Sequence, residues 1–193
     1  MLGDGSLSLK DYNPNLTNRL KISLNSKEDH DYLKYIQNLI VDIFKEKPII
    51  KYRKKENTAD LFIFKKEIIN YLIKNVGIKL TPKWKVALIP KKFLSENLSR
   101  YVLKGYFDTD GSLVTTNNNG LIYPRLEMKI CPSPMQSQFI GILTKNKFRF
   151  GTYKIEKGKV RIQLNGKNQL KKWINLIGFS NPKHSNKISR FLK

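Results

Sequence analysis

The sequence predicts an α+β fold built from two similar repeats, and three observations support this interpretation. The segment Asp4-Gly5-Ser6-Leu7 returns as Asp110-Gly111-Ser112-Leu113 roughly a hundred residues later, the length of a small structural unit. The same order of strand-like and helix-like patterns follows each copy. The 193-residue chain is 40% hydrophobic, which is enough for a real core. We therefore expect two pseudo-symmetric αββαββα repeats, the first without its N-terminal helix.

Each repeat is predicted to begin with a β-hairpin. Residues 19–24 and 125–130 alternate polar and apolar side chains, as a strand with one solvent-facing side does. Polar loops around residues 13–15 and 117–120 separate these runs from the Asp-Gly-Ser segments. A strand pair joined by such a loop is typical of an antiparallel hairpin.

A helix, a second hairpin and a closing helix are predicted next in each repeat. Apolar side chains recur at helical spacing within residues 33–43 and 139–143, and glycines 77 and 178 follow the closing helices. Thr81-Pro82-Lys83 then recurs as Asn181-Pro182-Lys183. The remaining strands and the closing helix are expected at 49–53, 61–64 and 68–75 in the first repeat, and at 152–155, 160–164 and 170–177 in the second.

The boundary between the repeats is predicted near Pro90, which divides the chain into residues 1–92 and 93–193. No low-complexity linker separates the halves. An apolar helical run, residues 98–107, leads into the second Asp-Gly-Ser segment, whereas the first copy has no such run before it.

A formal net charge of +22 favours a polyanionic partner, with nucleic acid first. No apolar run reaches membrane-spanning length and no basic amphipathic tail stands apart, so we expect no membrane partner. Cys131 is the only cysteine, which excludes an internal disulfide. Since no signal-peptide pattern is present either, we expect a cytoplasmic or other intracellular location, organelles included.

Residues 103–111, Leu-Lys-Gly-Tyr-Phe-Asp-Thr-Asp-Gly, resemble the motif that names the LAGLIDADG homing endonucleases. The likeness in repeat pattern covers nearly the whole chain. Asp-Thr-Asp-Gly also opens some calcium loops, but an EF-hand requires a later glycine and a closing glutamate that this segment lacks. The resemblance implies a site-specific endonuclease that cleaves double-stranded DNA.

The resemblance implies roles for the two repeated aspartates. In the family, two motif helices pack at the boundary between repeats, and Gly105 would allow the close approach of their backbones. Asp110 and, by residue matching, Asp4 would then meet and hold Mg²⁺ ions at the scissile phosphates. Asp108 is expected to be a structural carboxylate.

Two lysines match positions where the family often carries a basic residue near the active site. These are Lys83 and Lys183, one in each repeat. Such a lysine could orient water or stabilise the phosphate during cleavage. His184, which follows the second lysine, is expected at most to contact phosphate.

The resemblance further implies that the antiparallel sheets form a DNA-binding saddle with alternate residues of each hairpin facing DNA. Arg and Lys can read guanine, Gln adenine and Glu cytosine in the major groove, and many such side chains contact phosphate instead. The candidates are Lys10, Arg19, Lys21, Ser23, Lys51 and Arg53 in the first repeat, and Ser112, Thr116, Arg125, Glu127, Lys129, Lys154, Arg161 and Gln163 in the second.

The first motif departs from the family pattern because the residues matching its helix would precede Met1. We therefore expect Asp4 to lie on a fraying terminus and the 98–107 helix to expose Tyr101, Val102 and Tyr106. This predicts poor cleavage, or a weak homodimer through the exposed helix in place of a monomer. The alternative function is a non-cleaving DNA- or RNA-binding relative: a decayed endonuclease, an intron maturase or a regulator. A general basic RNA-binding protein is a third possibility that leaves the duplicated aspartates unexplained.

Overall fold

The computed structural model describes residues 2–13, 15, 17–188 and 191, which form two compact units, residues 1–83 and 84–193. Residues 84–92, which the sequence assigns to the first repeat, are bound within the second unit. The backbone N–H of Lys85 donates to the carbonyl of Pro132 (2.7 Å), and that of Met135 donates to the carbonyl of Ala87 (3.1 Å). The sequence-derived boundary between the repeats stays a prediction.

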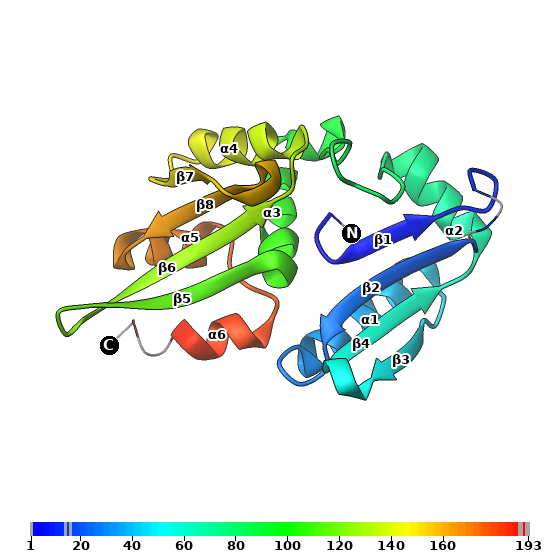
Figure 1. Ribbon diagram of the computed structural model, residues 1–193, viewed down its shortest axis with the longest axis horizontal. Helices are drawn as coiled ribbons and strands as arrows, with labels where there is room; N and C mark the ends of the chain where they lie inside the picture. Colours follow the sequence, from blue (N-terminus) through cyan, green and yellow to red (C-terminus); the bar gives the residue numbers. More distant parts are fainter. Residues whose placement is uncertain (1, 14, 16, 189–190, 192–193) are drawn as a thin grey trace. The chain divides into compact units, whose positions relative to one another are not determined.

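Unit 1 is a four-stranded antiparallel sheet with helices packed on one side (Figure 1). Its strand order is β1-β2-β4-β3, and the second hairpin, β3 and β4, follows a helix in the sequence. The elements are β1 (Gly5–Ser8), β2 (Arg19–Asn25), α1 (His30–Phe44), β3 (Ile49–Arg53), a 3₁₀ turn (Lys54–Glu56), β4 (Thr58–Ile63), α2 (Lys66–Tyr71) and a π-helical turn (Leu72–Val76).

Unit 2 repeats this plan with an additional helix at each end. Its antiparallel sheet has the order β5-β6-β8-β7 (Figure 1). The elements are a 3₁₀ turn (Lys91–Leu94), α3 (Glu96–Asp110), β5 (Gly111–Asn118), β6 (Leu121–Ile130), α4 (Met135–Lys145), β7 (Gly151–Lys154), a 3₁₀ turn (Glu156–Gly158), β8 (Val160–Asn165), α5 (Lys167–Leu176) and α6 (Pro182–Ile188).

The two sheets share their register as well as their strand order, which confirms the predicted pseudo-symmetry. Gly5 pairs with Ile22 as Gly111 pairs with Met128. The residue after Ile22, Ser23, lies opposite Asp60 of β4, and the residue after Met128, Lys129, lies opposite Arg161 of β8. Asp60 and Arg161 therefore hold equivalent positions in the two sheets. The two sheets therefore share their register but carry an acid in one and an arginine in the other at this position.

Apolar side chains cover one side of each sheet, as the alternation predicts. In β2 every second residue is buried, beginning with Leu20. In unit 1 these residues join α1 and α2 in one core, and in unit 2 the equivalent side of β6 packs against α5. Fully or nearly fully buried members include Leu20, Leu24, Leu33, Leu61 and Ile69 in unit 1, and Leu126, Met128, Phe139, Ile162 and Trp173 in unit 2.

Three elements differ from the sequence expectation. The motif helix runs to Asp110, so this aspartate is its last residue, and β6 begins at Leu121 rather than near 125. The β5–β6 loop is the two-residue turn Asn119-Gly120, with φ of 50° and 82°, a left-handed pair that suits a tight hairpin. Helix α6 was not predicted; Pro182 begins it, at the position where proline is favoured.

The expected exposure of the motif helix is right for Tyr101 and wrong for Tyr106. Tyr101 is 71% exposed, whereas Tyr106 is buried, because its ring packs on Phe139 (centroids 4.6 Å apart). Its hydroxyl donates to the carbonyl of Lys129 in β6 (2.8 Å). This side of α3 therefore faces its own sheet.

Gly111→Ala is expected to lower the free energy of unfolding by about 1–3 kcal/mol, since overpacking in a filled core costs this much. A Cβ there would lie 2.5 Å from the ring and the carbonyl oxygen of Phe107, and the backbone oxygen cannot move aside. Gly141→Ala is the matched control, because a Cβ in the middle of α4 meets nothing within 4 Å. That variant should gain about 0.5–1 kcal/mol from helix propensity. Urea denaturation measures both; equal effects would contradict the packing argument.

Candidate nucleic-acid interface

The polar side of the unit 1 sheet carries five of the six residues predicted for the first repeat. Cross-strand partners share a face, and the register pairs Lys21 with Phe62 and pairs both Ser23 and Lys51 with Asp60. Arg19 and Arg53 follow by alternation along β2 and β3. Lys10 lies beyond the end of β1, in an exposed turn, where its N–H donates to Asn18 Oδ1 (2.8 Å).

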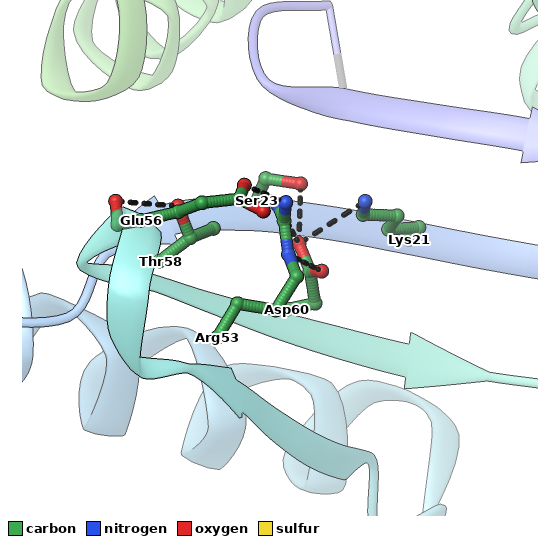
Figure 2. A network of polar contacts seen from close by, with 6 residues as sticks. All are labelled: Lys21, Ser23, Arg53, Glu56, Thr58 and Asp60. Carbon is green, nitrogen blue, oxygen red and sulfur yellow. Dashed lines mark hydrogen bonds and ion pairs between the residues drawn. The ribbon is translucent and has the colours of Figure 1, made fainter.

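Asp60 joins three of these residues into one network (Figure 2). Its Oδ1 accepts from Ser23 Oγ (2.7 Å) and lies 3.1 Å from Lys21 Nζ. Its Oδ2 accepts from Arg53 Nε (2.8 Å). Arg53 Nη1 also contacts Glu56, an exposed carboxylate at the end of the 3₁₀ turn.

The network changes the ionisation of its acid and its base. Burial of Asp60 opposes ionisation, but hydrogen bonds from Ser23, Arg53 and Lys21 outweigh it and lower the pKa of the Asp60 carboxyl. The hydrogen bond to Asp60, with a smaller one to Glu56, raises the pKa of the Arg53 guanidinium. Asp60 and Arg53 are therefore both charged across the physiological pH range.

Unit 2 presents a comparable polar face with a different arrangement. Register and alternation place Ser112, Thr116, Arg125, Glu127, Lys129, Arg161 and Gln163 on it. Glu127 and Gln163 are buried; the amide of Gln163 donates to Glu127 Oε1 (2.6 Å), and Arg125 Nε lies 2.8 Å from the same oxygen. One oxygen of the Glu127 carboxylate is thus bound by two protein side chains.

The expected orientation of Lys154 is wrong. In β7, Lys154 pairs with Val160 of β8, and the preceding residue, Tyr153, pairs with Arg161. Because adjacent residues of a strand point to opposite faces, Lys154 shares the side of the core residue Ile162, and Tyr153 shares the polar side. The Arg161 guanidinium lies over the Tyr153 ring, 5.4 Å from its centroid.

Asp4 is held in place rather than fraying. Its backbone carbonyl accepts from the N–H of Ser23 (3.3 Å), which extends the β1–β2 ladder. Leu2 packs against the core of unit 1. Lys83 Nζ donates to the carbonyls of Leu2 (3.0 Å) and Gly3. The predicted lysine thus binds the two residues that precede the predicted metal ligand.

Thr81 brings Lys83 to this position. The N–H of Thr81 donates to the carbonyl of Leu7 (2.9 Å), and Thr81 Oγ1 accepts from the N–H of Leu7 (3.1 Å). The segment that follows the closing helix is therefore bound along the edge of β1. This pairing is long-range, and the sequence pattern alone does not predict it.

In unit 2 the last turn of α3 is tied to the segment that carries Lys183. Asp108 is 1% exposed, and its carboxylate accepts from the N–H groups of Ser180 (2.9 Å) and Asn181 (3.2 Å). The Asn181 side chain returns a bond to the Asp108 carbonyl (3.0 Å). Burial raises the pKa of the Asp108 carboxyl, and these two N–H groups and the charges of Lys104 and Lys183 oppose the increase. Asp108 is structural, as expected.

The expected phosphate contact of His184 is wrong. Its side chain is 1% exposed, with its ring 4.9 Å from that of Phe107 and 5.5 Å from that of Phe179 (centroid distances). Asp110, by contrast, is exposed at the end of α3, where Thr109 Oγ1 donates to its Oδ2 (3.2 Å). Of the acidic residues in this turn, Asp110 is the one presented to solvent.

Sequence reasoning missed Asp60, although a signal existed. Asp60 is the only charged residue of the strand Thr58–Ile63, at a position that the period of two assigns to the polar face. No group of three or more His, Cys, Asp or Glu side chains that could hold a metal occurs among the described residues. Within the same residues, none of the helices has both the length and the apolar character needed to cross a membrane.

Asp60→Asn is expected to lower the free energy of unfolding by about 1–3 kcal/mol at pH 7, because the single oxygen of an amide cannot accept from Ser23, Lys21 and Arg53 together. Since the folded-state pKa is lowered, the carboxylate stabilises the fold above its ordinary pKa of about 4 and loses this effect as the pH falls through the lowered value. The difference between wild type and variant should therefore shrink below pH of about 4. Urea denaturation at several pH values tests this.

The matched control for this stability measurement is Asp31→Asn. Asp31 is 72% exposed on α1 and lies 3.8 Å from Lys34. Such a surface pair contributes less than about 1 kcal/mol, so the control should change stability little at any pH. A pH-independent loss in Asp60→Asn would contradict the assigned ionisation.

Comparisons with known proteins place this geometry in context. Residues 1–172 match the model of the LAGLIDADG DNA endonuclease family. Three similar solved structures are the meganuclease I-AabMI bound to uncleaved DNA (13% identity, TM-score 0.61), I-DmoI with DNA and Mn (15%, 0.62) and I-SmaMI bound to cleaved DNA (10%, 0.63). They cover 98%, 92% and 97% of this chain and 85%, 90% and 83% of their own. No curated protein sequence matches.

The solved structures share the fold of two four-stranded antiparallel sheets with flanking helices, and the family model spans most of the chain. The chain belongs to the LAGLIDADG DNA endonuclease family.

Proposed function

We propose that this protein is a site-specific homing endonuclease that hydrolyses phosphodiester bonds in double-stranded DNA with Mg²⁺. The observation that carries the proposal is the pair of matched aspartates. Asp4 precedes β1 and Asp110 precedes β5 at equivalent register positions, and both are exposed. Family membership and the similar nuclease structures with DNA support the activity.

The chemistry of the aspartates suits a divalent cation. Mg²⁺ is usually bound by one or two carboxylates together with water and phosphate oxygens, so one exposed carboxylate from each repeat is an adequate protein contribution. I-DmoI, a similar protein, has been solved with Mn. When bound, the ion would polarise the phosphoryl oxygen and lower the pKa of a coordinated water.

The two lysines would serve this reaction in different ways. Lys83 holds the Leu2 and Gly3 carbonyls and so fixes the backbone that presents Asp4, which makes it a positioning residue. Lys183 lies close enough to Asp108 to oppose the increase in its pKa, at the end of α3 that carries Asp110. There its ammonium would stabilise the negative charge that develops on the phosphate.

The +22 net charge supports DNA as the partner, since phosphate neutralisation supplies most non-specific affinity. The residues on the polar faces of the two sheets would contact the DNA; Lys154 is removed from the predicted set and Tyr153 is added on the unit 2 face. An intracellular location follows from this partner.

Asp110→Asn and Asp4→Asn should each abolish Mg²⁺-dependent cleavage, because an amide is a poor ligand for this ion. DNA affinity should remain within about threefold of wild type, since loss of one surface carboxylate removes repulsion rather than a contact. Cleavage of a randomised plasmid library, together with a filter-binding assay, measures both quantities.

Asp42→Asn is the matched control for the cleavage assay, as it makes the same change at an exposed residue of α1. Retained cleavage in Asp110→Asn would refute the two-carboxylate mechanism. A wild-type chain that binds specifically and never cleaves would favour the non-cleaving alternative.

We further propose a monomer or a weak homodimer, with α3 as the contact. Tyr101 and Leu98 are 71% and 41% exposed on this helix. Among the described residues, no atom lies within 4 Å of a Cβ built on Gly105, which leaves room for a neighbouring backbone.

Tyr101→Lys should therefore weaken self-association by at least about tenfold, because it places a charge in an apolar contact. Sedimentation equilibrium at several protein concentrations measures this. Tyr12→Lys is the control, as Tyr12 is similarly exposed (67%) in a loop. Equal association constants in the two variants would exclude α3 as the contact.

A further inference from the structure

Asp60 is a buried acid on the face that the proposed function assigns to DNA. Only 4% of its surface is exposed, and it lies in the strand β4 between two neighbouring strands of the sheet. A negative charge facing a phosphate backbone weakens binding, and a buried charge requires compensation. An acid at this position therefore needs a function whose benefit exceeds the loss of DNA affinity and the cost of burying its charge.

The contacts of Asp60 fix two long cationic side chains. Arg53, from β3 on one side, places Nε 2.8 Å from Oδ2 and Nη2 3.5 Å from Oδ1. Lys21, from β2 on the other side, places Nζ 3.1 Å from Oδ1. Figure 2 shows both side chains converging on the carboxylate. A two-point contact to a buried acid restricts the rotamers of Arg53 before any ligand binds.

The charge balance of this cluster differs from that of the chain. Lys21 and Arg53 carry two positive charges, and Asp60 and Glu56 carry two negative ones, so the four side chains are neutral together. The whole chain carries +22. A phosphate gains little from approaching a neutral cluster. A guanine edge is itself uncharged and presents two acceptors, O6 and N7, to oriented N–H donors.

We propose that Asp60 is a specificity-determining positioning residue, which holds Arg53 and Lys21 so that they donate to guanine acceptors in the major groove. The proposal rests on the proposed function as a sequence-specific DNA-binding protein and is independent of cleavage. Asp60 itself contacts no base; it acts through the geometry of its two partners.

The second repeat limits where the effect can occur. Arg161 holds the position equivalent to Asp60, so this cluster is not duplicated. There Glu127, on the central strand, holds Arg125 and Gln163 instead. Loss of Asp60 should therefore alter recognition at one or two adjacent base pairs and leave the rest of the target unchanged.

The test is selection of bound duplexes from a randomised DNA library, followed by sequencing, with wild type, Asp60→Asn and Asp31→Asn. Each substitution raises the net charge by one, so Asp31→Asn controls for electrostatics. Asp60→Asn should lose guanine preference at least about fivefold at one or two adjacent positions, which corresponds to the loss of a bidentate contact. Non-specific affinity for poly(dI-dC) should stay equal to or above that of wild type.

The outcomes separate the possible explanations. A uniform loss at every position would show a merely structural role and overturn the proposal, as would a profile equal to that of Asp31→Asn. A wild-type chain that selects no sequence would instead refute the proposed function. If circular dichroism shows that Asp60→Asn does not fold, Arg53→Lys serves as the test variant instead. It keeps the positive charge but removes the two parallel N–H donors of the guanidinium. Unchanged guanine preference in that variant would overturn the proposal.

Discussion

The last turn of α3 is the constraint on which the candidate site depends. Three consecutive residues bind three different parts of unit 2: Tyr106 to β6, Phe107 to the rings of Trp173, Phe179 and His184, and Asp108 to the backbone at 180–181. These three sets of contacts fix the position of the end of α3, and with it the position of its final residue. The packing of these three residues therefore presents Asp110 to solvent at the end of the helix.

In unit 1, other contacts hold the backbone that carries Asp4. The Asp4 carbonyl accepts from the N–H of Ser23, and Lys83 donates to the carbonyls of the two preceding residues. The cause is a long-range pairing within unit 1: Thr81 bonds to Leu7 on the edge of β1 and so brings Lys83 to the beginning of that strand. Lys83 thus has a structural task in unit 1, whatever else it contacts.

Patterns of period two and 3.6 predicted most elements, and β3 began and ended where expected. They also assigned the polar faces, since Lys21, Ser23, Arg125 and Gln163 alternate with core residues. What they could not supply was cross-strand pairing. Lys154 was misplaced because the β7–β8 turn sets its register, and Asp60 was missed because its partner Ser23 lies 37 residues away. Burial of His184 depends on an aromatic cluster assembled from three segments.

The shared register of the two sheets has a consequence for how the repeats have diverged. Their cores match position by position, whereas on the polar faces an acid in one repeat stands where an arginine stands in the other. The backbone arrangement of the two sheets is the same, but the side chains on their polar faces differ. A palindromic target would offer the same half-site to both repeats and could satisfy one of them at most. Under the proposed function, the expected DNA target therefore has two unlike halves, each suited to one repeat.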